Sequence, residues 1–182
     1  ALAVDASSPG TLYATTDTSG VFKSMDGGGR WTAANQGLTS RHVSVVTVQS
    51  GAVYAGSEAG RIFRSIDSAA SWTELTPPTT RVAVTAIAVD PYSPQVLYAG
   101  TNSEGIFKSS DGGMTWLHTA GQLSKGTVWT LLHDPTKAST IYATFQYEDL
   151  ANGTPWSIVW MSNGQQIIEQ QDAWDDGPQG RK

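Results

Sequence analysis

The sequence predicts an all-β protein made of four repeats of one small antiparallel sheet, and two observations lead to this prediction. A short run centred on a tyrosine recurs at spacings of 41, 44 and 44 residues, at Tyr13, Tyr54, Tyr98 and Tyr142. Two further aromatic positions follow in phase in the first three units, at Phe22, Phe63 and Phe107 and at Trp31, Trp72 and Trp116. Three aromatic positions in register indicate that successive units fold alike.

Each unit divides into four short runs with strand character. In the third unit these are residues 84–89, 96–100, 106–109 and 115–117, separated by turns that contain Asp, Pro or Gly. Apolar and polar residues alternate with period two, and no stretch shows the 3.6-residue period of an amphipathic helix. Four strands in roughly 40–45 residues are typical of one blade of a β-propeller. We therefore expect blades at about 1–38, 39–78, 79–123 and 124–170, with the repeats filling 1–164 and residues 165–182 forming the end of the last blade and an acidic tail.

Composition excludes several classes of function. The formal net charge of the 182-residue chain is −5, so no basic field is available to bind nucleic acid or an anionic membrane surface. The absence of cysteine excludes disulfides and thiolate chemistry. His42, His118 and His133 show no metal-ligand spacing, and no phosphate-binding loop is present, so we expect neither a metal nor a cofactor.

The turn between the third and fourth strands carries the most specific motif. It follows the pattern Ser-x-Asp-x-Gly and then Trp in the first and third units, whereas the second unit keeps Ser, Asp and Trp without the glycines. A short Asp side chain accepts N–H groups of its own turn, glycine supplies a positive φ, and the Trp is expected to fill space between blades. We assign a structural role to these residues: Ser24, Asp26, Gly28, Trp31, Ser65, Asp67, Trp72, Ser109, Asp111, Gly113 and Trp116.

This turn is similar to the Asp-box, or BNR, repeat, and residues 89–116 carry the resemblance most fully. Over nearly its whole length the chain resembles bacterial BNR-repeat proteins, xyloglucan-cleaving two-propeller glycosidases, sortilin-type propellers and the photosystem II assembly-factor propeller. The resemblance implies a sialidase-like propeller fold and says little about function. Such propellers usually have six or more blades, so the four units are expected to be a fragment, a small ring or one part of an assembly that other chains complete.

The topology of a propeller indicates where a ligand would bind. Loops between blades and loops between second and third strands share one face near the central channel, opposite the Asp-box turns; we call it the loop face. Trp129 stands where the inner strands of the two preceding units carry Ser44 and Thr85, so its indole either points into the channel, where it could stack on a sugar, or packs between blades. The expected binding residues are Arg41, His42, Arg81, Lys125, Trp129 and Tyr147.

Carboxylates on the loop face raise the alternative of glycoside hydrolysis, which needs a pair about 5–10 Å apart. Asp17 lies on this face, and the candidates for such a pair are Glu58, Glu104, Glu148 and Asp149. A solvated rim is the simpler interpretation, because charged loops are common on protein surfaces. Sialidase chemistry is disfavoured, since it needs three arginines around the substrate carboxylate and only Arg41 and Arg81 lie on this face.

Three hypotheses of function follow. The favoured one is a non-catalytic scaffold or binding module that contacts a protein or a polysaccharide through its loop face and tail. The alternatives are a fragment of a xyloglucanase-like glycoside hydrolase and an accessory or assembly subunit of a larger complex, such as a photosynthetic one. We expect an extracytoplasmic location, periplasmic or secreted, with no nucleic-acid partner and no membrane insertion.

Overall fold

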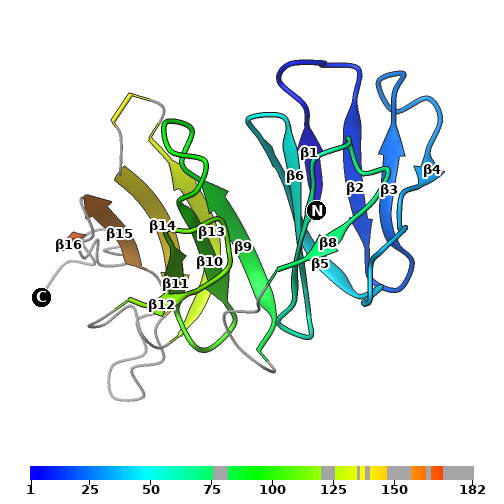
Figure 1. Cartoon of the computed structure of the whole chain (residues 1–182). Coiled ribbons are helices and arrows are strands. Elements are labelled where there is room, and N and C mark those ends of the chain that lie inside the picture. The colour runs from blue at the N-terminus through cyan, green and yellow to red at the C-terminus, as the bar shows by residue number, and fades with distance from the viewer. Residues whose placement is uncertain are drawn as a thin grey trace, which may run out of the picture.

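The computed structural model describes residues 1–75, 82–119, 126–134, 136–137, 140–146, 157–162 and 165–169. Within these ranges every regular element is a strand, and the strands form four antiparallel sheets of four strands each. The prediction of an all-β chain with four-stranded blades is therefore confirmed, and Figure 1 shows the sheets as separate units.

Strand order within each sheet follows the chain, so every blade is a meander. Blade 1 contains β1 (Leu2–Val4), β2 (Leu12–Thr16), β3 (Gly20–Ser24) and β4 (Thr32–Ala33). Blade 2 contains β5 (Val43–Gln49), β6 (Ala52–Ser57), β7 (Ile62–Ser65) and β8 (Thr73–Glu74). Blade 3 contains β9 (Val84–Val89), β10 (Leu97–Thr101), β11 (Ile106–Ser109) and β12 (Leu117–His118). Blade 4 contains β13 (Thr127–His133), β14 (Thr140–Gln146), β15 (Ser157–Ser162) and β16 (Gln165–Glu169).

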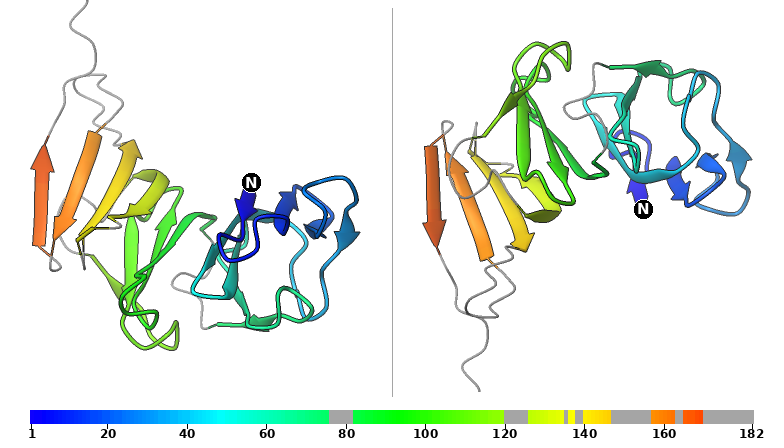
Figure 2. Two further views of the ribbon diagram at one scale, coloured as in Figure 1. Left: turned by 90° about the horizontal axis from the view of Figure 1, so that it is seen from above. Right: turned by 90° about the horizontal axis from the view of Figure 1, so that it is seen from below.

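The hydrophobic core lies between the blades. The first strand of each blade packs against the first strand of the blade before it, and Figure 2 shows the four sheets following one another in chain order. One cluster of buried apolar side chains fills each of the three junctions. At each junction the later blade contributes an aliphatic side chain from its first strand, namely Val46, Ile87 and Leu131, and each of these is 5–6% exposed. Burial of such side chains is the main stabilising contribution, so each blade depends on its neighbour.

A tyrosine at the same place in the second strand of blades 1 to 3 explains the strongest sequence repeat. Tyr13, Tyr54 and Tyr98 are at most 1% exposed, and burial raises the pKa of each phenol. A cation on the neighbouring strand stands directly opposite each ring, with Lys23, Arg64 and Lys108 at 5.5–5.9 Å from the ring centroids. The tyrosine is therefore a packing residue whose ring is covered by a cation.

Among the described residues, no helix is long and apolar enough to cross a membrane.

Candidate functional site

The Asp-box turns fold around their own carboxylates. In blade 3, Asp111 Oδ1 accepts hydrogen bonds from Ser109 Oγ at 2.8 Å and from the backbone N–H of Thr115 at 2.9 Å. Ser109 Oγ in turn accepts the N–H of Gly113 at 2.9 Å. Hydrogen bonds from the Thr115 hydroxyl, the Thr115 N–H and Ser109 lower the pKa of Asp111 to about 2. The carboxylate closes its own turn through these hydrogen bonds, which indicates a structural role.

The Asp-box of blade 2 keeps this geometry without glycine. Ser65 Oγ donates to Asp67 Oδ1 at 2.7 Å, and hydrogen bonds from Ser65 and Ser71 lower the pKa of Asp67 to about 2. Ser68 and Ala69 adopt φ values of 57° and 65°, the left-handed conformation that glycines adopt in the same turns of blades 1 and 3. This conformation is unfavourable for residues that carry a Cβ, so the turn of blade 2 is held under strain.

The Asp-box tryptophans take different environments in successive blades. Trp72 is 5% exposed and donates its Nε1–H to the carbonyl of Ala34 in blade 1 at 2.8 Å, so it packs against the preceding blade. Trp116 is half-buried and packs against the cluster between blades 2 and 3. Trp31 is 36% exposed, because no described sheet lies against that face of blade 1.

The structure places the predicted loop-face residues unequally. Arg41 and His42 lie in the loop before β5, and both are exposed. The side chains of Asp17, His42 and Glu58 converge, with His42 Nδ1 at 4.0 Å from Glu58 Oε2. Glu104 is held in its own turn, where its N–H donates to Thr101 Oγ1 at 3.0 Å. The remaining predicted residues, Arg81, Lys125, Tyr147, Glu148 and Asp149, lie outside the described residues.

Trp129 occupies a bulge in the first strand of blade 4, and its side chain is 51% exposed. Ser44 and Thr85 occupy the corresponding bulges in blades 2 and 3. Their hydroxyls donate to backbone carbonyls of the following blade, Ser44 to Val84 and Thr85 to Val128, each at 2.5 Å. At this position blade 4 carries a large, half-exposed indole in place of a small hydroxyl side chain.

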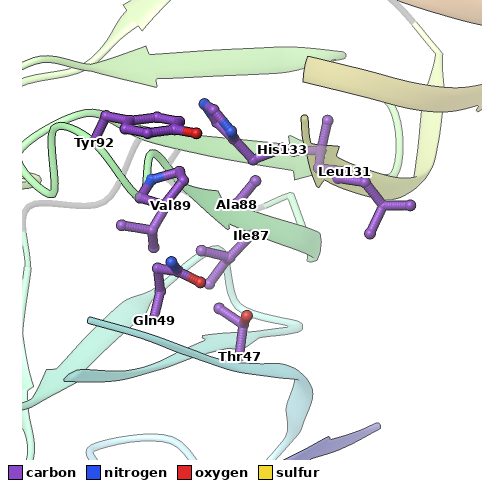
Figure 3. A pocket seen from close by; sticks show the side chains of 10 residues that line it. Thr47, Gln49, Ile87, Ala88, Val89, Tyr92, Leu131 and His133 are labelled. Atoms are coloured by element: carbon purple, nitrogen blue, oxygen red, sulfur yellow. The ribbon is translucent and has the colours of Figure 1, made fainter. Parts of the chain in front are cut away.

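A groove of about 420 Å³ lies across the first strands of blades 2, 3 and 4. The groove includes residues of the β9–β10 turn. That turn is hydrogen-bonded to the Asp-box of blade 3, since Gly112 N–H donates to the Gln95 carbonyl at 2.9 Å. The groove therefore lies near the end of these strands that is opposite the loop face. Figure 3 shows the side chains around it. The lining consists of Thr47, Gln49, Ile87, Ala88, Val89, Pro91, Tyr92, Leu131, Leu132 and His133.

The lining of the groove combines apolar surface with a few polar groups. Leu132 is 60% exposed and Tyr92 is 56% exposed, so both offer apolar contact area to a ligand. Thr47 and Gln49 supply neutral polar side chains from β5. None of the described residues that line this groove is an Asp, Glu, Lys or Arg. Since β5, β9 and β13 are each an edge strand of their sheet, the groove crosses three edge strands.

A buried pair of side chains shapes one end of the groove. His133 Nε2 lies 3.5 Å from Asp90 Oδ2, and the two side chains are 7% and 3% exposed. His133 Nδ1 lies 2.9 Å from the Asp134 carbonyl, which can only accept, so Nδ1 carries a hydrogen. Asp90 Oδ1 accepts the N–H of Tyr92 at 2.8 Å, which fixes the tyrosine near the histidine, with ring centroids 6.3 Å apart.

Sequence reasoning did not find Tyr92 and His133 as groove residues. The signal for His133 was present in the repeat itself, because Val4, Val48 and Val89 occupy the same place in the other three blades. A similar signal exists for Tyr92, because the turn has the same length in blades 1, 3 and 4, where the equivalent residues are Ser7 and Thr136.

Comparison with solved structures places this architecture among propellers. An ancestral GH74 enzyme superposes with a TM-score of 0.74 and 20% identity, over 97% of this chain and 24% of that one. The GH74 xyloglucanase from Xanthomonas campestris gives a TM-score of 0.67 and 17% identity, over 92% of this chain and 29% of that one. YCF48 bound to a D1 peptide gives a TM-score of 0.67 and 15% identity, over 94% of this chain and 52% of that one.

These similarities establish a β-propeller relationship at the level of fold. No protein-family profile matches the sequence, and no curated protein matches it. The chain spans about a quarter of the length of the GH74 structures and about half of YCF48.

Proposed function

We propose that this chain is a non-catalytic propeller module that binds an extended segment of a partner protein in the groove across β5, β9 and β13. The observation that carries the proposal is the lining of the groove, where exposed apolar side chains and neutral hydrogen-bonding side chains lie together on three edge strands. An extended peptide offers both kinds of complement, since its side chains alternate in direction and its backbone supplies donors and acceptors.

The described lining of the groove contains no Asp, Glu, Lys or Arg, which restricts the chemistry of the expected partner. A segment with an uncharged apolar residue suits this lining, which includes Leu132 and Tyr92, whereas a charged residue would be desolvated there. Peptide binding also has a precedent in the fold, because the solved YCF48 structure has a D1 peptide bound.

The test is selection of peptides from a random library on the purified chain, followed by titration calorimetry of the selected peptides. Leu132→Glu, a change at a 60%-exposed groove residue, is expected to weaken binding at least tenfold. The matched control is Ile66→Glu in the Asp-box turn of blade 2, where the side chain is 75% exposed and outside the groove; it should leave affinity unchanged. Equal affinity of the wild type and Leu132→Glu for every selected peptide would contradict the proposal.

A glycoside hydrolase fragment is the second candidate, because the structural neighbours include GH74 enzymes. It requires a carboxylate pair, for which Glu58 and Glu104 are the described candidates on the loop face. Release of reducing ends from xyloglucan by the purified chain, lost in Glu58→Gln or Glu104→Gln, would support this candidate over the binding module. Binding of xyloglucan oligosaccharides without cleavage would instead identify a carbohydrate partner.

A further inference from the structure

Three side chains with metal-ligand atoms meet on the loop face between blades 1 and 2. Asp17 comes from the β2–β3 turn, His42 from the loop before β5, and Glu58 from the β6–β7 turn. One ligand atom of each lies within 4.8 Å of the other two. His42 lies 25 positions after Asp17 and 16 before Glu58, so no local sequence motif predicts that the three side chains meet.

Two backbone hydrogen bonds, one between the blades and one within blade 2, hold these three loops together. The N–H of Gly20, the first residue of β3 after the turn that carries Asp17, donates to the Arg41 carbonyl of blade 2 at 3.0 Å. The N–H of Glu58 donates to the His42 carbonyl at 3.0 Å. The main chain therefore sets the spacing of the three side chains, and the fold does not need the side chains themselves for it.

The other two junctions provide an internal comparison. The N–H of Asn102 donates to the Ala83 carbonyl at 3.1 Å, which makes Ala83 the counterpart of His42 and Asn102 the counterpart of Glu58. Thr127, paired with Gln146, takes the His42 position in blade 4. The positions of Asp17, His42 and Glu58 are therefore held by Glu58, Ala83 and Asn102 at the second junction. At the third junction they are held by Asn102, Thr127 and Gln146. Only the first junction places two carboxylates and an imidazole together among the described residues.

We propose that Asp17, His42 and Glu58 form a binding site for one zinc ion. Two carboxylates balance the charge of a divalent cation, and an imidazole favours zinc over calcium or magnesium. Zinc–ligand distances of about 2.0–2.2 Å require the side chains to close in by about 1 Å. The side chains of His42 and Glu58 are each 57% exposed, so they are free to move by that amount, and the fourth position of the ion remains open to water.

The test is zinc titration of the chelator-treated chain in competition with a chromogenic chelator. We expect one zinc ion per chain, and an at least tenfold loss of affinity in His42→Ala and in Glu58→Gln. The matched control is His118→Ala, which removes an exposed histidine of β12 outside the cluster and should leave zinc affinity unchanged. Wild-type chain should also melt at a higher temperature with zinc than with chelator, and His42→Ala should not.

Three results would overturn the assignment. They are a wild-type chain that binds no zinc at micromolar concentration, a His42→Ala variant that binds as tightly as the wild type, and a preference for calcium over zinc. Circular dichroism in chelator separates these results from misfolding, because all four proteins should then give the same β-sheet spectrum.

Discussion

Blades 1 and 3 have equivalent faces on the side where a preceding blade would pack. Among the described residues, only blade 3 has a preceding blade against that face. Leu2 and Ile87 occupy equivalent places in the first strands of the two blades, and they are 63% and 5% exposed. The tryptophans of blades 1 and 2 differ in the same way, with Trp31 at 36% and Trp72 at 5%. Equivalent residues therefore contribute to stability according to the blade beside them, as expected for a repeat protein in which each unit contacts only its neighbours.

The largest expected difference is between the two tryptophans. Trp72→Ala removes a buried indole and its hydrogen bond to Ala34, so the free energy of unfolding should fall by about 3–5 kcal/mol. Trp31→Ala removes an indole that is already 36% exposed and should lower it by about 1 kcal/mol. Urea unfolding followed by circular dichroism measures both values. Equal losses in the two variants would show that a further blade covers Trp31 or that Trp72 is not packed.

The aliphatic pair should show a similar but smaller contrast. Ile87→Ala leaves a cavity between blades 2 and 3 and should cost about 2–4 kcal/mol. Leu2→Ala, at a side chain that is 63% exposed, should change stability by no more than about 0.5 kcal/mol. The same urea titration tests this pair, and a loss for Leu2→Ala that matches Ile87→Ala would contradict the comparison.

The ionised Asp-box carboxylates should make the free energy of unfolding decrease at acidic pH. The pKa of Asp67 is about 2 in the folded chain, below the ordinary value of 3.8, because Ser65 and Ser71 donate hydrogen bonds to its ionised form. A depressed pKa means that the unfolded chain binds the proton first, so this stabilisation is complete above about pH 4 and is lost as the pH falls toward 2. Asp67→Asn should have a lower urea midpoint than the wild type at pH 7, and the difference should shrink at pH 2.5. An unchanged difference would show that ionisation of Asp67 does not stabilise the turn.

The smallest expected effect concerns the turn without glycines. Ser68 has a φ of 57°, so Ser68→Gly should relieve strain and raise stability by about 0.5–1 kcal/mol. The reverse change, Gly27→Ser in blade 1, should lower stability by a similar amount. A Cβ at Gly27 would meet no atom within 4 Å, so this control reports backbone conformation and not a steric clash. Thermal unfolding of the two variants should therefore shift in opposite directions, and a shift in the same direction would contradict the account.

The sequence predicts the blades well because each one is specified locally. Tyr54 and Trp72 stand where the phase of the repeat places them, and both are buried at junctions between blades. The meeting of Asp17, His42 and Glu58 could not be predicted in the same way, because it depends on how two blades are set against each other. The groove likewise depends on three blades at once, although His133 at a position otherwise held by valine was a detectable sign of it.

The claim that the groove binds a protein segment is tested most directly by methyl NMR of the chain during titration with a selected peptide. Ile87 lines the groove, and Ile66 lies outside it on an Asp-box turn. We predict that saturation with the peptide shifts the methyl resonance of Ile87 and leaves that of Ile66 in place. A shift at Ile66 with none at Ile87 would place the binding site elsewhere and contradict the account.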